Sequence, residues 1–264
     1  MEIKSDEKIY PEAEYSYFLS DYSLPDYSLK VIRADSLPPK KGELIYESVR
    51  QKIYNDGDIR AYTSYYNASL GKYIEYGCKV NDSELYINYP DALREVSVFE
   101  CMDLPSMLLK KGIGIIHCSF IEYKGEAILF VGDKQVGKST QASLWEKYKS
   151  ADIINGDRAG VYFADGRFYA DGIPFCGTSK ICKNKKIPIK ALVCLSKGNE
   201  NKIKRLSAVE GFMSVLGKFT YNNTRDNVEL ISTLVKNLVE KVPVFEYSCL
   251  KDESAVNFLC KELL

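Results

Sequence analysis

The stretch IIHCSFIEYKGEAILFVGDKQVGKSTQASLWEKY, residues 115–148, decides the fold class of this chain. It predicts two apolar strands joined by a tight turn at Lys124 and Gly125, then a glycine loop, then a helix over 140–148. Its segment GDKQVGKST matches the pattern G-x-x-x-x-G-K-[ST]. The pattern stands where a strand ends and a helix begins, which is the context that a phosphate-binding loop requires.

The spacing of this motif suits the phosphate chain of a nucleotide. Gly132 and Gly137 let backbone N–H groups approach an anion closely, and the following helix directs its positive end to the same anion. We expect Lys138 to reach the β- and γ-phosphates and the Ser139 hydroxyl to ligate Mg²⁺. ATP and Mg²⁺ are therefore the expected cofactors. The predicted nucleotide-binding residues are Gly132, Asp133, Lys134, Gln135, Val136, Gly137, Lys138, Ser139 and Thr140.

The chain around this motif alternates predicted strands and helices. A helix is expected over 103–112, where Asp103 can cap and Gly112 follows the last lysines. Further strands are expected at ADIINGD, RAGVYF, RFYADG, IPIKALVCLSKG and PVFEYSCL, and helices at AVEGFMSVLG and NVELISTLVKNLVEKV. Such alternation indicates a layered α/β or α+β domain, which we place at residues 96–264.

Residues 1–95 are predicted to form a β-rich N-terminal region. Fourteen of the 20 tyrosines fall in residues 1–89, in short runs separated by turn-like NDGD (55–58), SLGK (69–72) and VNDS (80–83). The prolines of SLPPKKGE (36–43) predict a loop. The tyrosines supply either a binding face or a filled core.

Composition excludes several classes of function. The chain has 264 residues with 36 basic and 36 acidic side chains, so no net charge attracts nucleic acid or an anionic membrane. The first residues lack a signal-peptide pattern, and no apolar run is long enough to cross a bilayer. Eight scattered cysteines without a CxxC pair, and a single histidine, argue against a zinc site and for reduced thiols. We expect a cytoplasmic protein whose partners include neither nucleic acid nor a membrane.

Three segments resemble the HPr kinase/phosphorylase-like proteins, whose fold is related to phosphoenolpyruvate carboxykinase. They are residues 115–148, INGDRAGVY (154–162) and GIPFCGTSK (172–180), in the family's order along the chain. The resemblance covers roughly residues 112–250, and the N-terminal region matches only the small bacterial relatives. It implies a P-loop kinase core of this type with a β-rich N-terminal part.

The resemblance also implies roles for single residues. Asp157 stands where the family has its catalytic aspartate, a general base on the acceptor hydroxyl that also lies near the metal; the alternative is an ordinary turn aspartate. His117 stands at a family histidine that contacts phosphate or tunes the base, or else is satisfied inside the core. Arg158, Thr178 and Ser179 are candidate substrate contacts. The alternatives are that Arg158 is an ordinary surface arginine and that Thr178 and Ser179 form a local turn.

The sequence departs from the family at several positions. Gln135 replaces the usual inner glycine of the loop, and ICKNKKIPIK (181–190) replaces a long glycine- and arginine-rich signature, so phosphorylase activity is not expected. No second metal carboxylate is identified; Glu122, Asp133 and Asp152 are candidates by proximity in sequence alone. The lysine run at 180–190 is either a solvated loop or a docking strip for an acidic peptide.

The leading hypothesis is a kinase that transfers the γ-phosphate of ATP to a hydroxyl group. Family resemblance favours a serine of a peptide or small protein as acceptor, with a small metabolite next. The alternative is a non-catalytic nucleotide-binding module that acts as a peptide- or partner-binding switch. A homo-oligomer is compatible with either. The absence of an N-K-x-D motif argues against an ordinary GTPase, and ALVCLS ends in serine, which argues against a motor-type ATPase.

Overall fold

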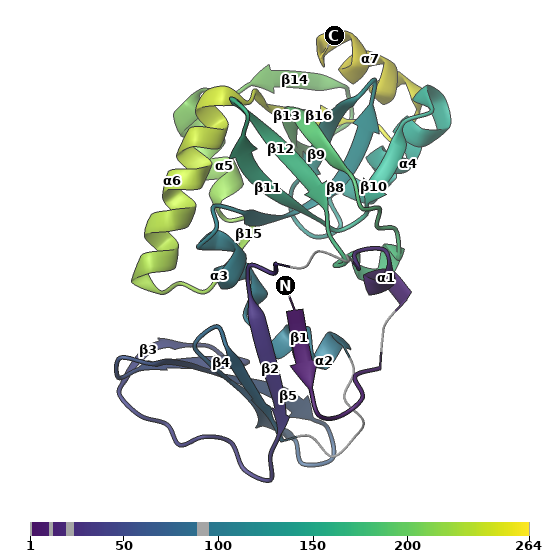
Figure 1. Ribbon diagram of the computed structural model, residues 1–264. Helices are drawn as coiled ribbons and strands as arrows, with labels where there is room; N and C mark the ends of the chain where they lie inside the picture. Colours follow the sequence, from purple (N-terminus) through teal and green to yellow (C-terminus); the bar gives the residue numbers. More distant parts are fainter. Residues whose placement is uncertain (1, 11–12, 20–23, 89–94, 264) are drawn as a thin grey trace. The chain divides into compact units, whose positions relative to one another are not determined.

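The structure is a computed structural model that describes residues 2–10, 13–19, 24–88 and 95–263 (Figure 1). The chain divides into an N-terminal unit, Met1–Met107 with Asn222–Thr224, and a C-terminal unit, Leu108–Tyr221 with Arg225–Leu264. The division falls later than the boundary expected at residue 95. The reason is that α2 (Glu95–Cys101) and the residue after it pack Val98, Cys101 and Met102 into the core of the N-terminal unit.

The N-terminal unit contains a seven-stranded sheet in its described residues, with strand order β1-β2-β7-β6-β5-β4-β3. The pairs β1–β2 and β2–β7 are parallel, and the others are antiparallel. The predicted turns at 55–58, 69–72 and 80–83 connect the antiparallel strands β4 to β7. The elements are β1 (Glu2–Ser5), α1 (Ala13–Ser16), β2 (Ser28–Arg33), β3 (Glu43–Glu47), β4 (Gln51–Asn55), β5 (Ile59–Asn67), β6 (Lys72–Val80) and β7 (Glu84–Ile87).

The tyrosines of this sheet serve both as core and as surface. Tyr62 and Tyr76 are buried, and their hydroxyls donate to the Pro38 carbonyl and the Glu100 carboxylate, each at 2.9 Å. By contrast, Tyr66 and Tyr73 are exposed and contact each other edge to face. Buried tyrosines need such hydrogen bonds because an unpaired hydroxyl inside a core is costly.

The C-terminal unit contains a mixed nine-stranded sheet in its described residues. The order is β10-β8-β11-β12-β13-β16-β14; in addition, β9 pairs with both β8 and β13, and β15 pairs with β8. β9 is antiparallel to β8 and parallel to β13. The strands are β8 (Gly114–Tyr123), β9 (Glu126–Val131), β10 (Asp152–Asn155), β11 (Arg158–Ala164), β12 (Arg167–Gly172), β13 (Lys186–Lys197), β14 (Lys202–Arg205), β15 (Phe219–Thr220) and β16 (Val244–Cys249).

The hairpin predicted from the sequence is present as β8 and β9. Its two turn residues, Lys124 and Gly125, have φ of +53° and +78°. Two successive positive φ values are typical of the type I′ turn, whose twist matches that of the flanking strands. The turn therefore fixes the register that places Tyr123 opposite Glu126 and Cys118 opposite Val131.

Helices cover both faces of this sheet (Figure 1). α4 (Lys138–Lys149) and α7 (Glu253–Leu263) pack on one face, and α5 (Ala208–Leu216) and α6 (Arg225–Lys241) on the other. β9 serves both layers because its side chains alternate: Leu129 and Val131 face α5 and α6, while Ile128 and Phe130 face α4 and α7. This three-layer arrangement confirms the α/β class.

Several local expectations are corrected. The helix predicted over 103–112 is shorter, α3 (Leu104–Leu109), because Asp103 has a φ of +51° and the chain turns after Leu109. α7 and β14 were not predicted as separate elements. All eight cysteines are free. None of the helices in the described residues is both long and apolar enough to span a lipid bilayer.

Candidate functional site

The candidate site lies in the C-terminal unit, where β9 ends. Val131 is the last residue of β9 and stands opposite Cys118 of β8 and Cys194 of β13. The glycine loop (residues 132–137) follows at once, and α4 begins at Lys138. His117 stands opposite Arg158, the first residue of β11, so that Asp157 lies at this same end. The fold thus brings the loop, His117 and Asp157 together.

The glycine loop is held in a conformation that few residues adopt. Gly132, Gln135 and Gly137 have φ of +150°, +64° and +117°. At Gly132 a Cβ would lie 2.9 Å from the Val136 side chain and 3.1 Å from the Leu195 carbonyl oxygen, so no larger residue fits. Gln135 adopts the left-handed conformation despite its side chain, which costs about 1–2 kcal/mol. The loop is therefore strained where the sequence departs from glycine.

The Lys138 side chain folds back onto the start of the glycine loop. Its side chain is buried, and Nζ donates to the carbonyl oxygens of Gly132 and Asp133, both at 3.0 Å. A lysine ammonium has three N–H bonds, and these carbonyls use two of them. Burial lowers the pKa of Lys138, whereas the neighbouring Cys118 and Asp157 raise it. The ammonium group is thus positioned at the loop with capacity for a further acceptor.

The first turn of α4 is suited to an anion. Among the described residues no side chain caps the helix at Gly137, and its first turn contains no acidic residue. The initial N–H groups of a helix have no acceptor within the helix and carry the positive end of its dipole. Ser139 and Thr140 of this turn are exposed, so their hydroxyls are accessible.

Asp157 is positioned by a buried asparagine. Asn155 is fully buried, and its Oδ1 accepts from the backbone N–H groups of Asp157 at 2.9 Å and Arg158 at 3.0 Å. Its Nδ2 donates to the Ile173 carbonyl at 2.7 Å. The Asn-Gly-Asp segment is therefore a turn, as one alternative expected, and the same turn directs Asp157 to the site.

The carboxylate of Asp157 lies between two basic side chains. Nδ1 of His117 lies 3.3 Å from its Oδ1, and Nε of Arg158 lies 3.2 Å from its Oδ2. Burial lowers the pKa of His117, and the positive charge of Lys138 lowers it further, while Asp157 opposes both. The neutral imidazole is therefore favoured at neutral pH.

The segment with Thr178 and Ser179 packs against Asp157. Gly177 begins the short helix η1 (Gly177–Ser179), and a Cβ there would lie 2.9 Å from the Asp157 carboxyl carbon. Ser179 Oγ donates to the Cys176 carbonyl at 2.6 Å and accepts from Ile181 N, so it shapes the turn. Thr178 is exposed. The predicted acceptor contacts thus lie beside the predicted base.

Two of the carboxylates considered as a second metal ligand, Glu122 and Asp152, form ion pairs with lysines. Lys185 Nζ lies 3.1 Å from a Glu122 oxygen and 2.8 Å from an Asp152 oxygen, and Lys183 also pairs with Asp152. These pairs neutralise part of the lysine run at 180–190, which weakens its interpretation as a docking strip. In the part of the chain that the structure describes, no three His, Cys, Asp or Glu side chains are grouped as a metal site.

Two residues of the site escaped the sequence analysis. Asn155 falls in the segment ADIINGD, for which a strand was expected, and the signal that marks it is its position two residues before Asp157. Lys218, in the turn after α5, pairs with Asp133 of the glycine loop. No local pattern indicates Lys218, because 85 residues separate the two partners.

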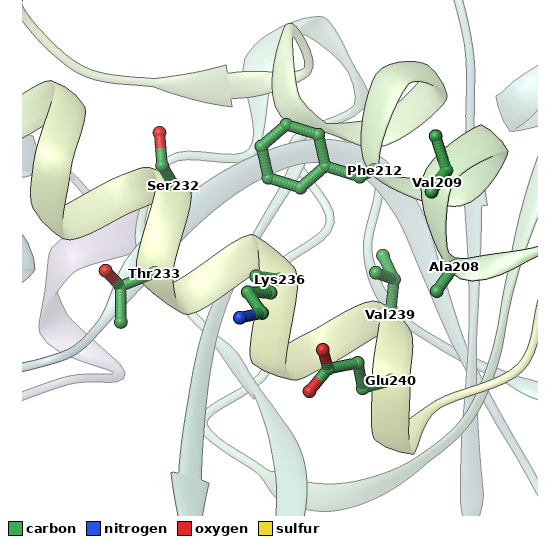
Figure 2. Close-up of a pocket in the computed structure, with 8 residues that line it drawn as sticks. All are labelled: Ala208, Val209, Phe212, Ser232, Thr233, Lys236, Val239 and Glu240. Atoms are coloured by element: carbon green, nitrogen blue, oxygen red, sulfur yellow. The ribbon is translucent and has the colours of Figure 1, made fainter.

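The C-terminal unit also has a groove that is separate from these residues. It is a groove of about 440 Å³ between α5 and α6, shown in Figure 2. Its lining residues are Ala208, Val209, Phe212, Ser232, Thr233, Lys236, Val239 and Glu240. None of the site residues predicted from the sequence contributes to it.

Comparisons with known proteins find similarity among solved structures. No family model matches the chain, and no curated protein matches it. Among solved structures the chain is similar to the Hpr(Ser) kinase/phosphatase from Coxiella burnetii, at 9% sequence identity and a TM-score of 0.31. The match covers 56% of this chain and 92% of that chain. We draw no conclusion about fold or site from so distant a likeness.

Proposed function

We propose that this chain is an ATP- and Mg²⁺-dependent kinase of the HPr kinase-like type. It transfers the γ-phosphate to a hydroxyl group, that of a serine in a peptide or small protein. The observation that carries this proposal is the placement of Asp157: a buried asparagine turn holds its carboxylate at the end of the sheet where the glycine loop begins.

The glycine loop and the first turn of α4 bind the phosphates in this proposal. Backbone N–H groups of residues 132–140 and the uncapped end of α4 receive the phosphate oxygens. Lys138 supplies an ammonium group that is buried and held in place by two carbonyls. A buried cation binds a phosphate more strongly than an exposed one because water screens it less.

The residues present fit Mg²⁺. The exposed Ser139 hydroxyl and the Asp157 carboxylate are oxygen donors, which this ion prefers. Two protein ligands suffice because Mg²⁺ commonly keeps waters and takes phosphate oxygens for its remaining positions. When bound, the ion neutralises negative charge on the phosphates during transfer.

Asp157 acts as the general base. The acceptor hydroxyl oxygen attacks the γ-phosphorus, and the bond from phosphorus to the β,γ-bridging oxygen breaks, which leaves ADP. The hydroxyl proton passes to the Asp157 carboxylate. His117, whose Nδ1 lies 3.3 Å from that carboxylate, packs beside it and orients it. Arg158 and the exposed Thr178 border the acceptor, while Ser179 maintains the turn beside it.

A second candidate function is favoured by the ion pair between Asp157 and Arg158. Arg158 Nε lies 3.2 Å from Oδ2 of Asp157, so the guanidinium occupies an oxygen that an acceptor hydroxyl would need. In this alternative the chain binds nucleotide without transfer and acts as a peptide- or partner-binding switch. A small-metabolite acceptor and a homo-oligomeric assembly remain compatible with both functions.

The test is phosphate transfer from γ-labelled ATP to serine-containing peptides, to the chain itself and to water. We expect Asp157→Asn to retain ATP binding through the glycine loop and to transfer phosphate about 100- to 10,000-fold more slowly. Asp165→Asn, at a carboxylate 79% exposed on the turn after β11, is the matched control and should keep the wild-type rate. If the wild type and Asp157→Asn both bind ATP and neither transfers phosphate to any acceptor, the result would favour the non-catalytic switch.

A further inference from the structure

Lys218 is fixed beside the glycine loop by its own backbone. Its N–H donates to the Val215 carbonyl at 2.9 Å, which closes the turn after α5. Its carbonyl oxygen accepts from the N–H of His117, also at 2.9 Å. Because His117 contacts the proposed base Asp157, Lys218 is tied to the centre of the site rather than to its rim.

The side chain of Lys218 reaches the loop and pairs with Asp133. It is largely covered, at 27% exposure, whereas the Asp133 side chain is 86% exposed. This hydrogen bond lowers the pKa of Asp133. The ammonium group is thus held at the glycine loop by a partner that water can readily solvate instead.

Two ammonium groups from different layers converge on the loop. Lys138 begins α4 on one face of the sheet, and Lys218 follows α5 on the opposite face. Both groups bind Asp133, Lys138 through the backbone carbonyl oxygen at 3.0 Å and Lys218 through the carboxylate, and the charge of Lys218 helps to lower the pKa of Lys138. Repulsion between like charges costs free energy unless an anion lies between them. A phosphate chain is such an anion.

We propose that Lys218 is a second phosphate-binding cation of this site. When a nucleoside triphosphate binds, the Lys218 ammonium group exchanges the Asp133 carboxylate for phosphate oxygens. This inference rests on the proposed function, because it uses the same bound nucleotide. Asp133 then acts as a stand-in anion that holds the lysine in place while the site is free.

The exchange has a physical reason. Asp133 returns to water at little cost because it is already exposed, whereas Lys218 stays largely covered. A covered cation gains more from several phosphate oxygens than from one exposed carboxylate, since charge-assisted hydrogen bonds strengthen as water is excluded. The site therefore favours polyphosphates over a single carboxylate.

The test is calorimetric titration of five proteins, the wild type and four variants, with ATP and Mg²⁺. Lys218→Met should bind ATP about tenfold more weakly than the wild type, which corresponds to about 1.4 kcal/mol. Asp133→Asn breaks the same ion pair but leaves the lysine free, so it should bind at least as tightly as the wild type. Lys204→Met removes a lysine that pairs with Glu210 elsewhere in the unit, and it should bind unchanged.

The change in ATP affinity caused by Asp133→Asn distinguishes a phosphate-binding role of Lys218 from a role that only braces the loop. If Lys218 only braces the loop through Asp133, then both substitutions weaken ATP binding alike, and the inference is overturned. Wild-type affinity in Lys218→Met overturns it as well. Lys218→Arg should restore most of the affinity, which excludes misfolding as the cause. If the wild type itself binds no ATP, the proposed function is wrong. Failure of the Lys218 inference alone would instead appear as ATP binding by the wild type with one of the variant results above.

Discussion

The end of β9 and the groove between α5 and α6 are two regions of one unit with opposite character. The groove has a volume of about 440 Å³ and is lined mainly by apolar atoms of two helices (Figure 2). The end of β9 gathers Lys138, Lys218, His117 and Asp157 from four separate segments. The comparison teaches that a proposal of chemistry here depends on convergent charged groups rather than on the presence of a groove.

The two regions also differ in how many buried polar groups and strained backbone positions they contain. At the end of β9, Lys138 and Asn155 are buried polar groups, and Gln135 holds a left-handed φ. At the groove, Val209 is 75% exposed, and Phe212 is only partly buried where it packs against the core. Strain and buried polarity persist where surrounding structure enforces them, and such positions cluster at functional sites.

If the end of β9 is the functional region, Asn155→Ala should have the largest effect among the substitutions considered below. The substitution leaves the N–H groups of Asp157 and Arg158 and the Ile173 carbonyl without their partner. We expect the free energy of unfolding to fall by about 2–3 kcal/mol. We also expect kcat to fall about tenfold or more because Asp157 loses its position. Thermal unfolding and transfer assays measure both.

A matched control exists in the N-terminal unit. Asn55 Oδ1 accepts from Gly57 N at 2.9 Å, which is the same type of turn bond as that from Asn155 to Asp157. This bond is exposed, so Asn55→Ala should cost little stability and leave kcat unchanged. An unchanged kcat in folded Asn155→Ala would show that Asn155 does not position the base.

A smaller effect concerns the titration of His117, the single histidine of the chain. Burial and the charge of Lys138 lower its pKa from the ordinary value of 6.5. Nuclear magnetic resonance of the tag-free protein should therefore show one imidazole that titrates below 6.5. Lys138→Met should raise this pKa, since a positive charge is removed, and Asp157→Asn should lower it.

The same titration gives a pH dependence of stability. Because the pKa of His117 is depressed in the folded state, its contribution is fully present above 6.5 and is lost as pH falls through the folded pKa. His117→Gln should remove this part of the acid sensitivity. A pKa above 6.5 that Lys138→Met does not change would contradict the described geometry.

Local patterns explain what the sequence predicted well. The Lys124-Gly125 turn, the strand before Gly132 and the helix after it follow from residues adjacent in the chain. Alternation of apolar residues along β9 and the apolar stripe of α6 likewise depend on neighbours. The α/β class could be inferred because each such element needs an opposing layer to cover it.

Long-range contacts explain the features that could not be predicted from the sequence. The pairing of Lys218 with Asp133, and the boundary between the units after Met107, depend on segments that meet only in the folded chain. The lysine run at 180–190 gave no indication that Lys183 and Lys185 pair with Glu122 and Asp152 across the fold. Sequence reasoning located candidate residues by type but could not assign their partners.

The most direct test of the central claim is calorimetric binding of ATP with Mg²⁺ to the wild type, Lys138→Ala and Val209→Ser. The account predicts binding by the wild type, affinity about 100-fold lower in Lys138→Ala, and unchanged affinity in Val209→Ser. Val209→Ser should also keep the free energy of unfolding within about 0.5 kcal/mol. Absence of ATP binding by the wild type, or equal binding by Lys138→Ala, would contradict the claim that the glycine loop binds nucleotide.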